Sequence, residues 1–139
     1  MASVSDHDLA ALAAAARDAR ERAHAPYSRF RVGAALLDEH GRVHGGCNVE
    51  NAAYPQSLCA EAVALGALVA AGGTRVHAVV VAGDGAETLV PCGGCRQKLS
   101  EFAGADTPVV SIDDSRVRAR HTLGELLPFG FGPAHLRSS

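Results

Sequence analysis

The fold of this chain is decided by residues 76–82, Val76-His77-Ala78-Val79-Val80-Val81-Ala82. Apart from the histidine the run is apolar and rich in valine, a pattern typical of a strand that lies at the centre of a sheet and is buried on both faces. Such a strand needs neighbouring strands beside it and helices above and below it. The rest of the chain is expected to supply both.

Upstream of this strand, apolar residues at helical spacing predict a first helix over residues 6–23. Residues 30–37 and 42–48 are predicted strands on either side of a turn at residues 38–41, which predicts a hairpin. A second helix is expected over residues 58–71, with Ser57 as its N-cap and two glycines directly after its end.

Downstream of the central strand, a third helix is predicted over residues 91–102, with the proline at its first position. Apolar residues 107–112 predict another strand, and residues 117–120 a short edge strand. Thr122 and Glu125 form a capping box for a last short helix. Helices that alternate with apolar strands predict an α/β fold with helices on both faces of the sheet.

Composition excludes several classes of protein. The 139 residues suit a single domain spanning positions 1–139, and the hydrophobic fraction of 47 % is enough for a core. The net charge of −2 and the six aromatic residues, four Phe and two Tyr, argue against a nucleic-acid binder. No apolar run is long enough to span a membrane, and the N-terminus lacks the pattern of a signal peptide, so a cytoplasmic location is expected.

Three cysteines and a glutamate carry the chemistry of the chain. They occur in two short motifs, Cys59-Ala60-Glu61 and Pro91-Cys92-Gly93-Gly94-Cys95. Three thiolates can hold Zn²⁺ and leave its fourth position open for a water, and a carboxylate two residues from one ligand can move protons on that water. Both motifs fall at predicted helix N-termini, where partial positive charge favours thiolates.

A structural zinc site is the alternative reading of these motifs. Such a site normally has four protein ligands, and Cys47 is the one further cysteine that can supply a fourth. Cys47 lies on a predicted strand between Gly46 and Asn48, so a small buried hydrophobic role is expected for it. The seven histidines show no ligand spacing and are expected at the surface.

With these motifs the chain resembles the small homotetrameric cytidine deaminases, a family of zinc-dependent nucleobase deaminases. The resemblance covers nearly the whole length. It is carried by residues 25–30 (APYSRF), 32–36 (VGAAL), 46–52 (GCNVENA), 54–55 (YP), 59–61 (CAE), 91–97 (PCGGCRQ), 126–128 (LLP) and 131–133 (FGP). The resemblance implies a three-layer α-β-α sandwich with a mixed five-stranded sheet, one Zn²⁺ per subunit held by Cys59, Cys92 and Cys95, and shared active sites in a homotetramer.

The resemblance also implies the reaction. Glu61 is expected to take a proton from the zinc-activated water that attacks C4 of the pyrimidine, and to pass protons to N3 and to the leaving ammonia. The backbone at Ala60 and the Glu61 carboxylate read the base edge. Asn48 and Glu50 bind the ribose hydroxyls, and their alternate positions on a strand would put both on one face. The expected outcome is conversion of cytidine and 2'-deoxycytidine to uridine and 2'-deoxyuridine in pyrimidine salvage.

Three aromatic residues complete the implied binding site. Phe30 is expected near the pyrimidine, while Tyr54 and Phe131 are expected to reach the ligand from neighbouring subunits. Without the resemblance, the two phenylalanines would be assigned to the core.

The chain departs from the family pattern directly after the glutamate. Most members have an arginine there, which donates hydrogen bonds to the thiolates, and this chain has Ala62. Three thiolates and one Zn²⁺ carry a net charge of −1 and make a weaker Lewis acid than a site with neutral ligands. Arg96, which follows Cys95, is therefore expected to support the thiolates in part.

Other functions predict different behaviour. A deaminase of another aminopyrimidine nucleoside, such as blasticidin S, would share the zinc motifs, but residues 48–51 and 131–133 favour cytidine. The acidic balance, the few aromatic residues and the Asn48–Glu50 pair argue against a polynucleotide-editing deaminase, because no residues stand out for base stacking or phosphate contacts. A non-catalytic zinc-binding module would bind zinc tightly without any activity that depends on Glu61.

Overall fold

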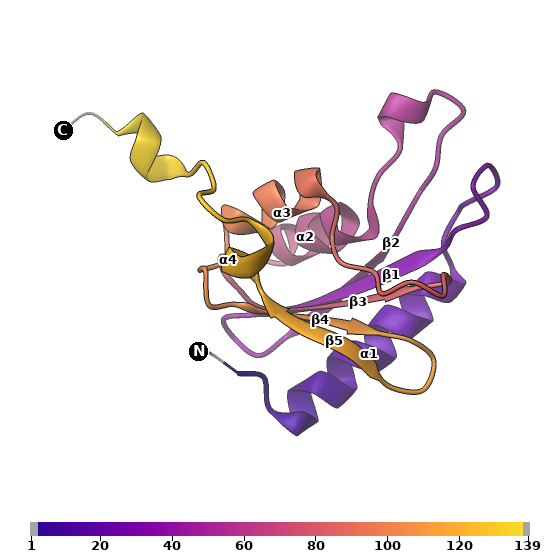
Figure 1. Cartoon of the computed structure of the whole chain (residues 1–139), viewed down its shortest axis with the longest axis horizontal. Helices are drawn as coiled ribbons and strands as arrows, with labels where there is room; N and C mark the ends of the chain where they lie inside the picture. Colours follow the sequence, from indigo (N-terminus) through magenta and orange to yellow (C-terminus); the bar gives the residue numbers. More distant parts are fainter. Residues whose placement is uncertain (1–2, 138–139) are drawn as a thin grey trace.

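The computed structural model describes residues 3–137, and these form one mixed five-stranded sheet with helices on both faces (Figure 1). The strand order is β2-β1-β3-β4-β5. The strands are β1 (Val32–Asp38), β2 (Val43–Cys47), β3 (Val76–Gly83), β4 (Pro108–Ile112) and β5 (Val117–Thr122). The helices are α1 (Asp6–Glu21), α2 (Ala60–Ala70), α3 (Gly93–Ser100) and α4 (Leu123–Leu126). The predicted three-layer α/β class and the predicted element order are confirmed.

Strand β3 lies at the centre of the sheet, as its apolar sequence predicts. It pairs antiparallel with β1 and parallel with β4, and Val80 lies opposite Ala35 on one side and Val110 on the other. The hairpin β1–β2 and the pair β4–β5 are antiparallel. Successive β3 side chains point to opposite faces, so Val79 and Val81 enter the core beneath α2 and α3 while Val80 enters the core beneath α1.

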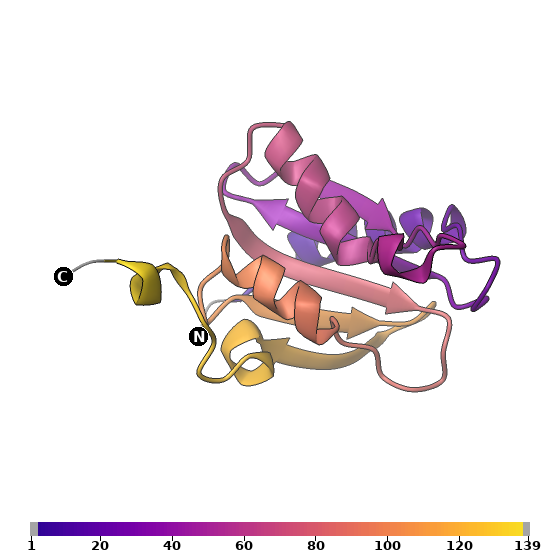
Figure 2. The same ribbon diagram turned by 90° about the horizontal axis from the view of Figure 1, so that it is seen from above.

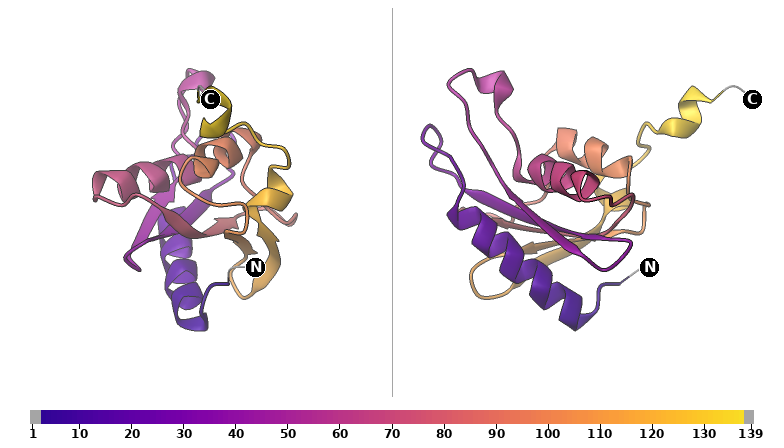
Figure 3. Two further views of the ribbon diagram at one scale, coloured as in Figure 1. Left: turned by 90° about the vertical axis from the view of Figure 1, so that its left-hand side faces the viewer. Right: turned by 180° about the vertical axis from the view of Figure 1, so that it is seen from behind.

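The helices form one layer on each face of the sheet. Figure 2 shows α2, α3 and α4 together on one face, and the right panel of Figure 3 shows α1 on the other. Two glycines of the hairpin let these layers approach closely. A Cβ on Gly33 would lie 1.9 Å from the carbonyl oxygen of Ala16 in α1, and a Cβ on Gly46 would lie 2.4 Å from the amide nitrogen of Ala64 in α2. The absence of side chains here allows backbone-to-backbone packing.

The two site-bearing helices begin later than predicted. Cys59 and Cys92 are the N-caps, so α2 starts at Ala60 and α3 at Gly93. Ser57 is not an N-cap, because Leu58 is held extended by two backbone hydrogen bonds with Val49. Pro91 likewise precedes its helix instead of opening it. Both shifts bring a cysteine, rather than a serine or a proline, to the helix start.

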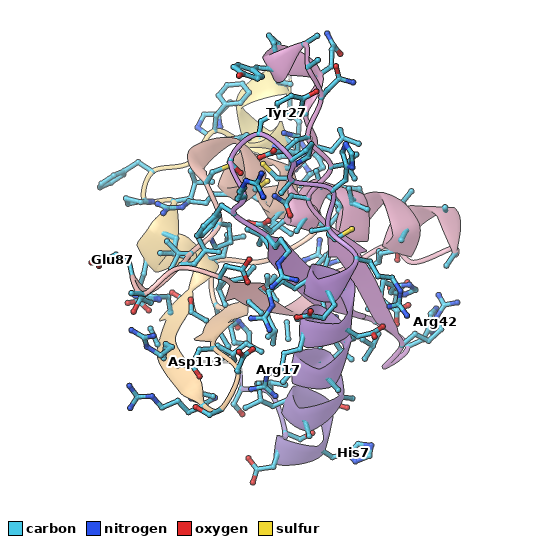
Figure 4. The ribbon with its side chains drawn as sticks, turned by 90° about the vertical axis from the view of Figure 1, so that its right-hand side faces the viewer. His7, Arg17, Tyr27, Arg42, Glu87 and Asp113 are labelled. Carbon is cyan, nitrogen blue, oxygen red and sulfur yellow. The ribbon has the colours of Figure 1, made fainter. Side chains whose placement is uncertain are left out.

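Three segments extend away from the layers. The loops over residues 24–31 and 48–58 rise together from one end of the molecule, and the segment after α4 projects from the other end (Figures 1 and 3). Short 3₁₀ turns at Tyr54–Gln56 and Pro133–Leu136, which were not predicted, lie in these segments. Figure 4 shows Tyr27 at the end of the molecule opposite to His7. No helix within residues 3–137 is long and apolar enough to cross a membrane.

Candidate active site

Three thiols meet where α2 and α3 begin. The sulfurs of Cys59, Cys92 and Cys95 all lie within 4.8 Å of one another, and those of Cys59 and Cys92 are 3.7 Å apart. For sulfurs about 2.3 Å from a tetrahedral zinc, the expected separation is about 3.8 Å. The Cys59–Cys92 separation therefore already matches that of two zinc ligands, Cys95 lies close enough to be the third, and the donor set of three sulfurs suits zinc.

Two of the three thiols, those of Cys59 and Cys95, sit in an environment that resists loss of their protons. Burial, together with the negative charge of Glu61 and the other thiols, raises the pKa of Cys95. Burial and the hydrogen bond with Cys92 raise the pKa of Cys59. Burial also disfavours the Cys92 thiolate, but hydrogen bonds from Cys95 and Cys59 outweigh it and lower the pKa of Cys92. A bound divalent cation would displace these protons, so metal binding here is expected to weaken as the pH falls.

Cys47 does not join the three thiols. Among the described residues the cluster of possible metal ligands comprises Cys59, Cys92 and Cys95 alone. Cys47 ends strand β2 opposite Gly33 and is half-buried rather than fully buried. The three-ligand arrangement leaves one coordination position open, which is the arrangement of catalytic rather than structural zinc sites.

Glu61 lies in the first turn of α2, beside the thiols. Its side chain is almost fully buried, with 5 % of the residue surface exposed. Burial raises the pKa of this carboxyl, and the hydrogen bond from its own backbone N–H only partly opposes the effect. No hydrogen bond from another residue reaches the carboxylate within residues 3–137. A raised pKa makes this carboxyl group a better proton acceptor than an exposed glutamate, which suits a general acid and base.

A pocket of about 260 Å³ opens in front of Glu61 and the thiols. Its walls come from the start of β1, the segment after β2, the first turn of α2 and the loop before α3. Its lining includes Asn48, Glu50, Cys59, Ala60, Glu61, Leu89, Val90 and Cys92. The predicted ribose-binding, base-reading and proton-carrying residues are therefore brought together in one cavity. Leu89 and Val90 were missed, because nothing in their local sequence marks the wall of a pocket.

Asn48 and Glu50 brace the pocket as well as line it. Strand β2 ends before them, yet both reach the same cavity. The Asn48 side chain accepts from the Val32 N–H and donates to the Phe30 carbonyl, each at 2.8 Å. The Glu50 carboxylate accepts from the Ser28 hydroxyl and from the backbone N–H groups of residues 27 and 28. These hydrogen bonds, the one from the Ser28 hydroxyl first, lower the pKa of Glu50 and keep it ionised.

The three predicted aromatic contacts lie outside this pocket in the single chain. The Phe30 ring packs over Gly85. Tyr54 is 71 % exposed and meets Tyr27 edge to face, with ring centroids 5.9 Å apart. Both tyrosines line a second hollow of about 310 Å³ that shares Glu50 and Ser57 with the pocket. Phe131 is 54 % exposed and stacks on His135 in the projecting C-terminal segment.

Arg96 makes contacts other than those predicted. Its Nε donates to the Pro91 carbonyl at 2.6 Å and its Nη1 to the Leu126 carbonyl at 2.9 Å. No hydrogen bond to a sulfur is present for this guanidinium among the described residues. The expectation that Arg96 supports the thiolates in part by hydrogen bonds to sulfur is therefore corrected: its guanidinium holds the carbonyl before Cys92 and the last carbonyl of α4, because these two oxygens lie within its reach.

Comparison with known proteins gives a consistent match. The family model for the cytidine and deoxycytidylate deaminase zinc-binding region matches residues 6–111. A cytidine deaminase of Mycobacterium tuberculosis (strain ATCC 25618 / H37Rv) is 45% identical over 127 residues, which cover 91% of this chain and 92% of the relative. A cytidine deaminase of Sporosarcina psychrophila is 40% identical over 129 residues, covering 93% and 95%.

Solved structures of cytidine deaminases also superpose on the chain over most of its length. A crystal structure of cytidine deaminase from Burkholderia pseudomallei superposes with a TM-score of 0.82 at 43% identity, covering 92% of this chain and 100% of that one. The structure of cytidine deaminase from Mycobacterium tuberculosis gives a TM-score of 0.76 at 42% identity, covering 93% and 99%.

Proposed function

The chain belongs to the cytidine and deoxycytidylate deaminase family, and we propose on this basis that it is a zinc-dependent hydrolase that converts cytidine and 2'-deoxycytidine to uridine and 2'-deoxyuridine with release of ammonia. One observation carries the proposal: a buried carboxyl group with a raised pKa, Glu61, lies beside three thiols at zinc-binding distances in a pocket of nucleoside size. Cys59, Cys92 and Cys95 are proposed as the zinc ligands.

The side chains of this pocket supply proton transfer and orientation. Zinc, when bound by the three sulfurs, supplies the Lewis acidity that makes a water a competent nucleophile near neutral pH. Glu61 accepts the proton of the water that attacks C4 of the pyrimidine and delivers it to N3. The C4–O bond forms, the C4–N4 bond breaks, and Glu61 carries a second proton to the departing ammonia. A single carboxyl group can serve both steps because burial raises its pKa and so favours proton uptake as well as release.

Substrate orientation is assigned to residues on both sides of the pocket. Asn48 and Glu50 are proposed to bind the ribose hydroxyls, an assignment supported by their place in the pocket lining. The Ala60 backbone is proposed to read the base edge together with Glu61, since both lie in the first turn of α2. Phe30 is proposed to border the pyrimidine from the loop that Asn48 holds.

A homotetramer with shared active sites is part of the proposal. It is supported by Tyr54 and Phe131, which are exposed in the single chain and lie on projecting segments. It is supported also by the outward side of α2, where Gly66, Ala67 and Val69 are exposed although the helix is apolar. Exposed apolar surface of this kind is typical of an interface. We propose further that residues 1–139 act as a single cytoplasmic domain in pyrimidine salvage, without nucleic acid or membrane as a partner.

The test is deamination of cytidine and 2'-deoxycytidine by the wild-type protein and by Glu61→Ala, with zinc content measured in both. Uridine and ammonia from the wild type, and a zinc-loaded but inactive variant, would support the proposal. Zinc-loaded wild-type protein that acts on blasticidin S but not on cytidine would replace the substrate assignment. Zinc-loaded protein without activity on any aminopyrimidine nucleoside would favour a zinc-binding module instead.

A further inference from the structure

The loop over residues 84–92 joins β3 to α3 and carries one wall of the pocket. Leu89 and Val90 line the cavity, and Cys92 follows them at the start of α3. The position of this loop therefore affects both the width of the pocket and the approach of the substrate to Glu61.

A single hydroxyl group reaches this wall from inside the sheet. Ser111 lies on β4, where every residue is buried, and 1 % of its surface is exposed. It alternates with Val110 and therefore faces the same side of the sheet as Val109, which belongs to the core beneath α2 and α3. A hydroxyl buried among aliphatic side chains is unfavourable unless it forms a hydrogen bond. This one donates to the carbonyl oxygen of Leu89.

The side chain of Leu89 is fixed at a second point. A Cβ on Gly83, the last residue of β3, would lie 2.7 Å from Cδ2 of Leu89 and 3.4 Å from Cζ of Phe30. Leu89 therefore packs directly onto the strand end, next to the ring proposed to border the pyrimidine. Its carbonyl is held by Ser111 and its side chain by Gly83, so Leu89 has little freedom to move away from the pocket.

Other contacts hold different parts of the same loop. Asp84 pairs with Arg31 at 2.8 Å, and Arg118 donates to the carbonyl of Ala86 at 3.0 Å. Arg96 holds the carbonyl before Cys92. These three contacts fix the beginning of the loop and its metal-binding end. Within residues 3–137, the hydrogen bond from Ser111 is the one that acts on the wall itself.

We propose that Ser111 is a positioning residue that sets substrate affinity: its buried hydroxyl holds the Leu89–Val90 wall of the pocket in place without touching substrate or metal. This inference rests on the proposed deaminase function. It predicts that loss of the hydroxyl widens the pocket and weakens substrate binding, while the zinc ligands and Glu61 stay in place.

The test compares Ser111→Ala with the matched pair Ser111→Thr and Ser111→Val, which have the same shape and differ in the hydroxyl. Ser111→Ala and Ser111→Val are expected to raise KM for cytidine about fivefold to tenfold, the size of one lost hydrogen bond, with zinc content and kcat close to wild type. Ser111→Thr is expected to retain the wild-type KM. Ser5→Ala, which removes a capping hydroxyl on α1 on the opposite face of the sheet, serves as the control.

A second measurement does not depend on activity. Hydrogen–deuterium exchange of peptides spanning residues 84–92, without substrate, is expected to accelerate in Ser111→Ala and Ser111→Val but not in Ser111→Thr or Ser5→Ala. Equal KM and exchange in the Thr and Val variants would overturn the proposal, as would a joint loss of zinc and kcat in Ser111→Ala. If the wild type does not deaminate cytidine, the proposed deaminase function is wrong, and the exchange measurement alone then tests the role of Ser111. Unaltered exchange of residues 84–92 in Ser111→Ala would show that Ser111 does not position the wall.

Discussion

Two buried carboxyl groups lie near opposite ends of α2 and behave in opposite ways. Glu61 is in the first turn of the helix. Asp38 ends strand β1 and pairs with Arg42, whose Nη1 donates to the carbonyl of Ala71 at the C-terminal end of α2. Both residues are at most 5 % exposed. Burial raises the pKa of Glu61, whereas the pKa of Asp38 is well below its usual value.

The difference comes from the number of donors around each carboxylate. Burial by itself would raise the pKa of Asp38 too, but His44 Nε2 and Arg42 Nε each donate to it at 2.8 Å, and the backbone N–H groups of residues 40 and 42 donate as well. His44 is 11 % exposed at its side chain, so the expectation of a surface position is wrong for this histidine. A buried carboxylate with all its donors stabilises the hairpin, and one without them is left free for proton transfer.

The largest expected effect is on Glu61. Glu61→Gln keeps the size of the side chain but cannot exchange a proton, so kcat for cytidine is expected to fall about 10²-fold to 10⁴-fold. Since no partner depends on this carboxylate, the free energy of unfolding at neutral pH is expected to stay equal or increase. Steady-state kinetics, urea unfolding and zinc analysis on the same preparation measure this. A large drop in the unfolding free energy of Glu61→Gln would show that Glu61, like Asp38, stabilises the fold.

Asp38→Asn is expected to give the converse result. It leaves the donors of Arg42 and His44 without their charged acceptor, and the expected cost is about 3 kcal/mol of unfolding free energy. The KM and kcat for cytidine are expected to remain near wild type below the unfolding transition, because Asp38 lies at the far end of α2 from Glu61. Urea titration at pH 7 measures the cost. Loss of activity in protein shown to be folded would count against the separation of roles.

The two groups are also expected to give opposite pH dependence in the zinc-free protein. Asp38 has a lowered folded-state pKa, so its contribution to stability is complete above the unfolded value of about 3.9 and is lost as the pH falls through the folded value. Glu61 has a raised folded-state pKa, so its contribution is complete below about 4.3 and is lost as the pH rises through the folded value.

Urea midpoints measured from pH 3 to pH 8 test both signs. The advantage of the wild type over Asp38→Asn is expected to shrink below about pH 4, with a slope of up to about 1.4 kcal/mol per pH unit. The advantage of Glu61→Gln over the wild type is expected to grow as the pH rises above about 4. Parallel curves for the wild type and either variant would show that the corresponding pKa shift is absent.

The smallest expected effect belongs to His44. His44→Ala removes one of the four donors to Asp38 and is expected to cost about 1 kcal/mol of unfolding free energy. The remaining donors hold Asp38 less strongly, so the variant is expected to lose stability at a higher pH than the wild type does on acidification. His7→Ala, on the first turns of α1, is the control for an exposed histidine. If both variants unfold at the same pH on acidification, the hydrogen bond from His44 does not stabilise the Asp38 carboxylate.

Much of the site could be predicted because its central residues occur in two short motifs. The three cysteines meet because each motif lies at a helix start, and helix starts depend on a few neighbouring residues. Even so, Ser57 was predicted as the N-cap of α2 and Pro91 as the first residue of α3. In the structure Cys59 and Cys92 are the N-caps of these helices. Backbone pairing of residue 58 with residue 49 moved the start of α2, and no local signal contains that pairing.

The contacts that shape the pocket wall could not be predicted. Ser111 lies 22 residues from Leu89 in the chain and reaches it only because β4 runs parallel to β3. Arg96 was assigned to the sulfurs from its position next to Cys95, but its guanidinium turns to two carbonyl groups instead. Long flexible side chains choose partners that the folded backbone presents, and their neighbours in sequence are a poor guide to those partners.

The sequence by itself determined the order of the elements, the central position of β3 and the composition of the metal motif, because hydrophobic periodicity and helix-start signals act over a few residues. Only the tertiary structure decided which buried carboxylate is saturated with donors and which is not. Asp38 precedes a predicted turn and Glu61 belongs to the metal motif, but neither pattern states how many donors surround each carboxylate once it is buried. Their pKa values shift in opposite directions because folding brings the donors of His44 and Arg42 to Asp38 and leaves Glu61 facing a pocket.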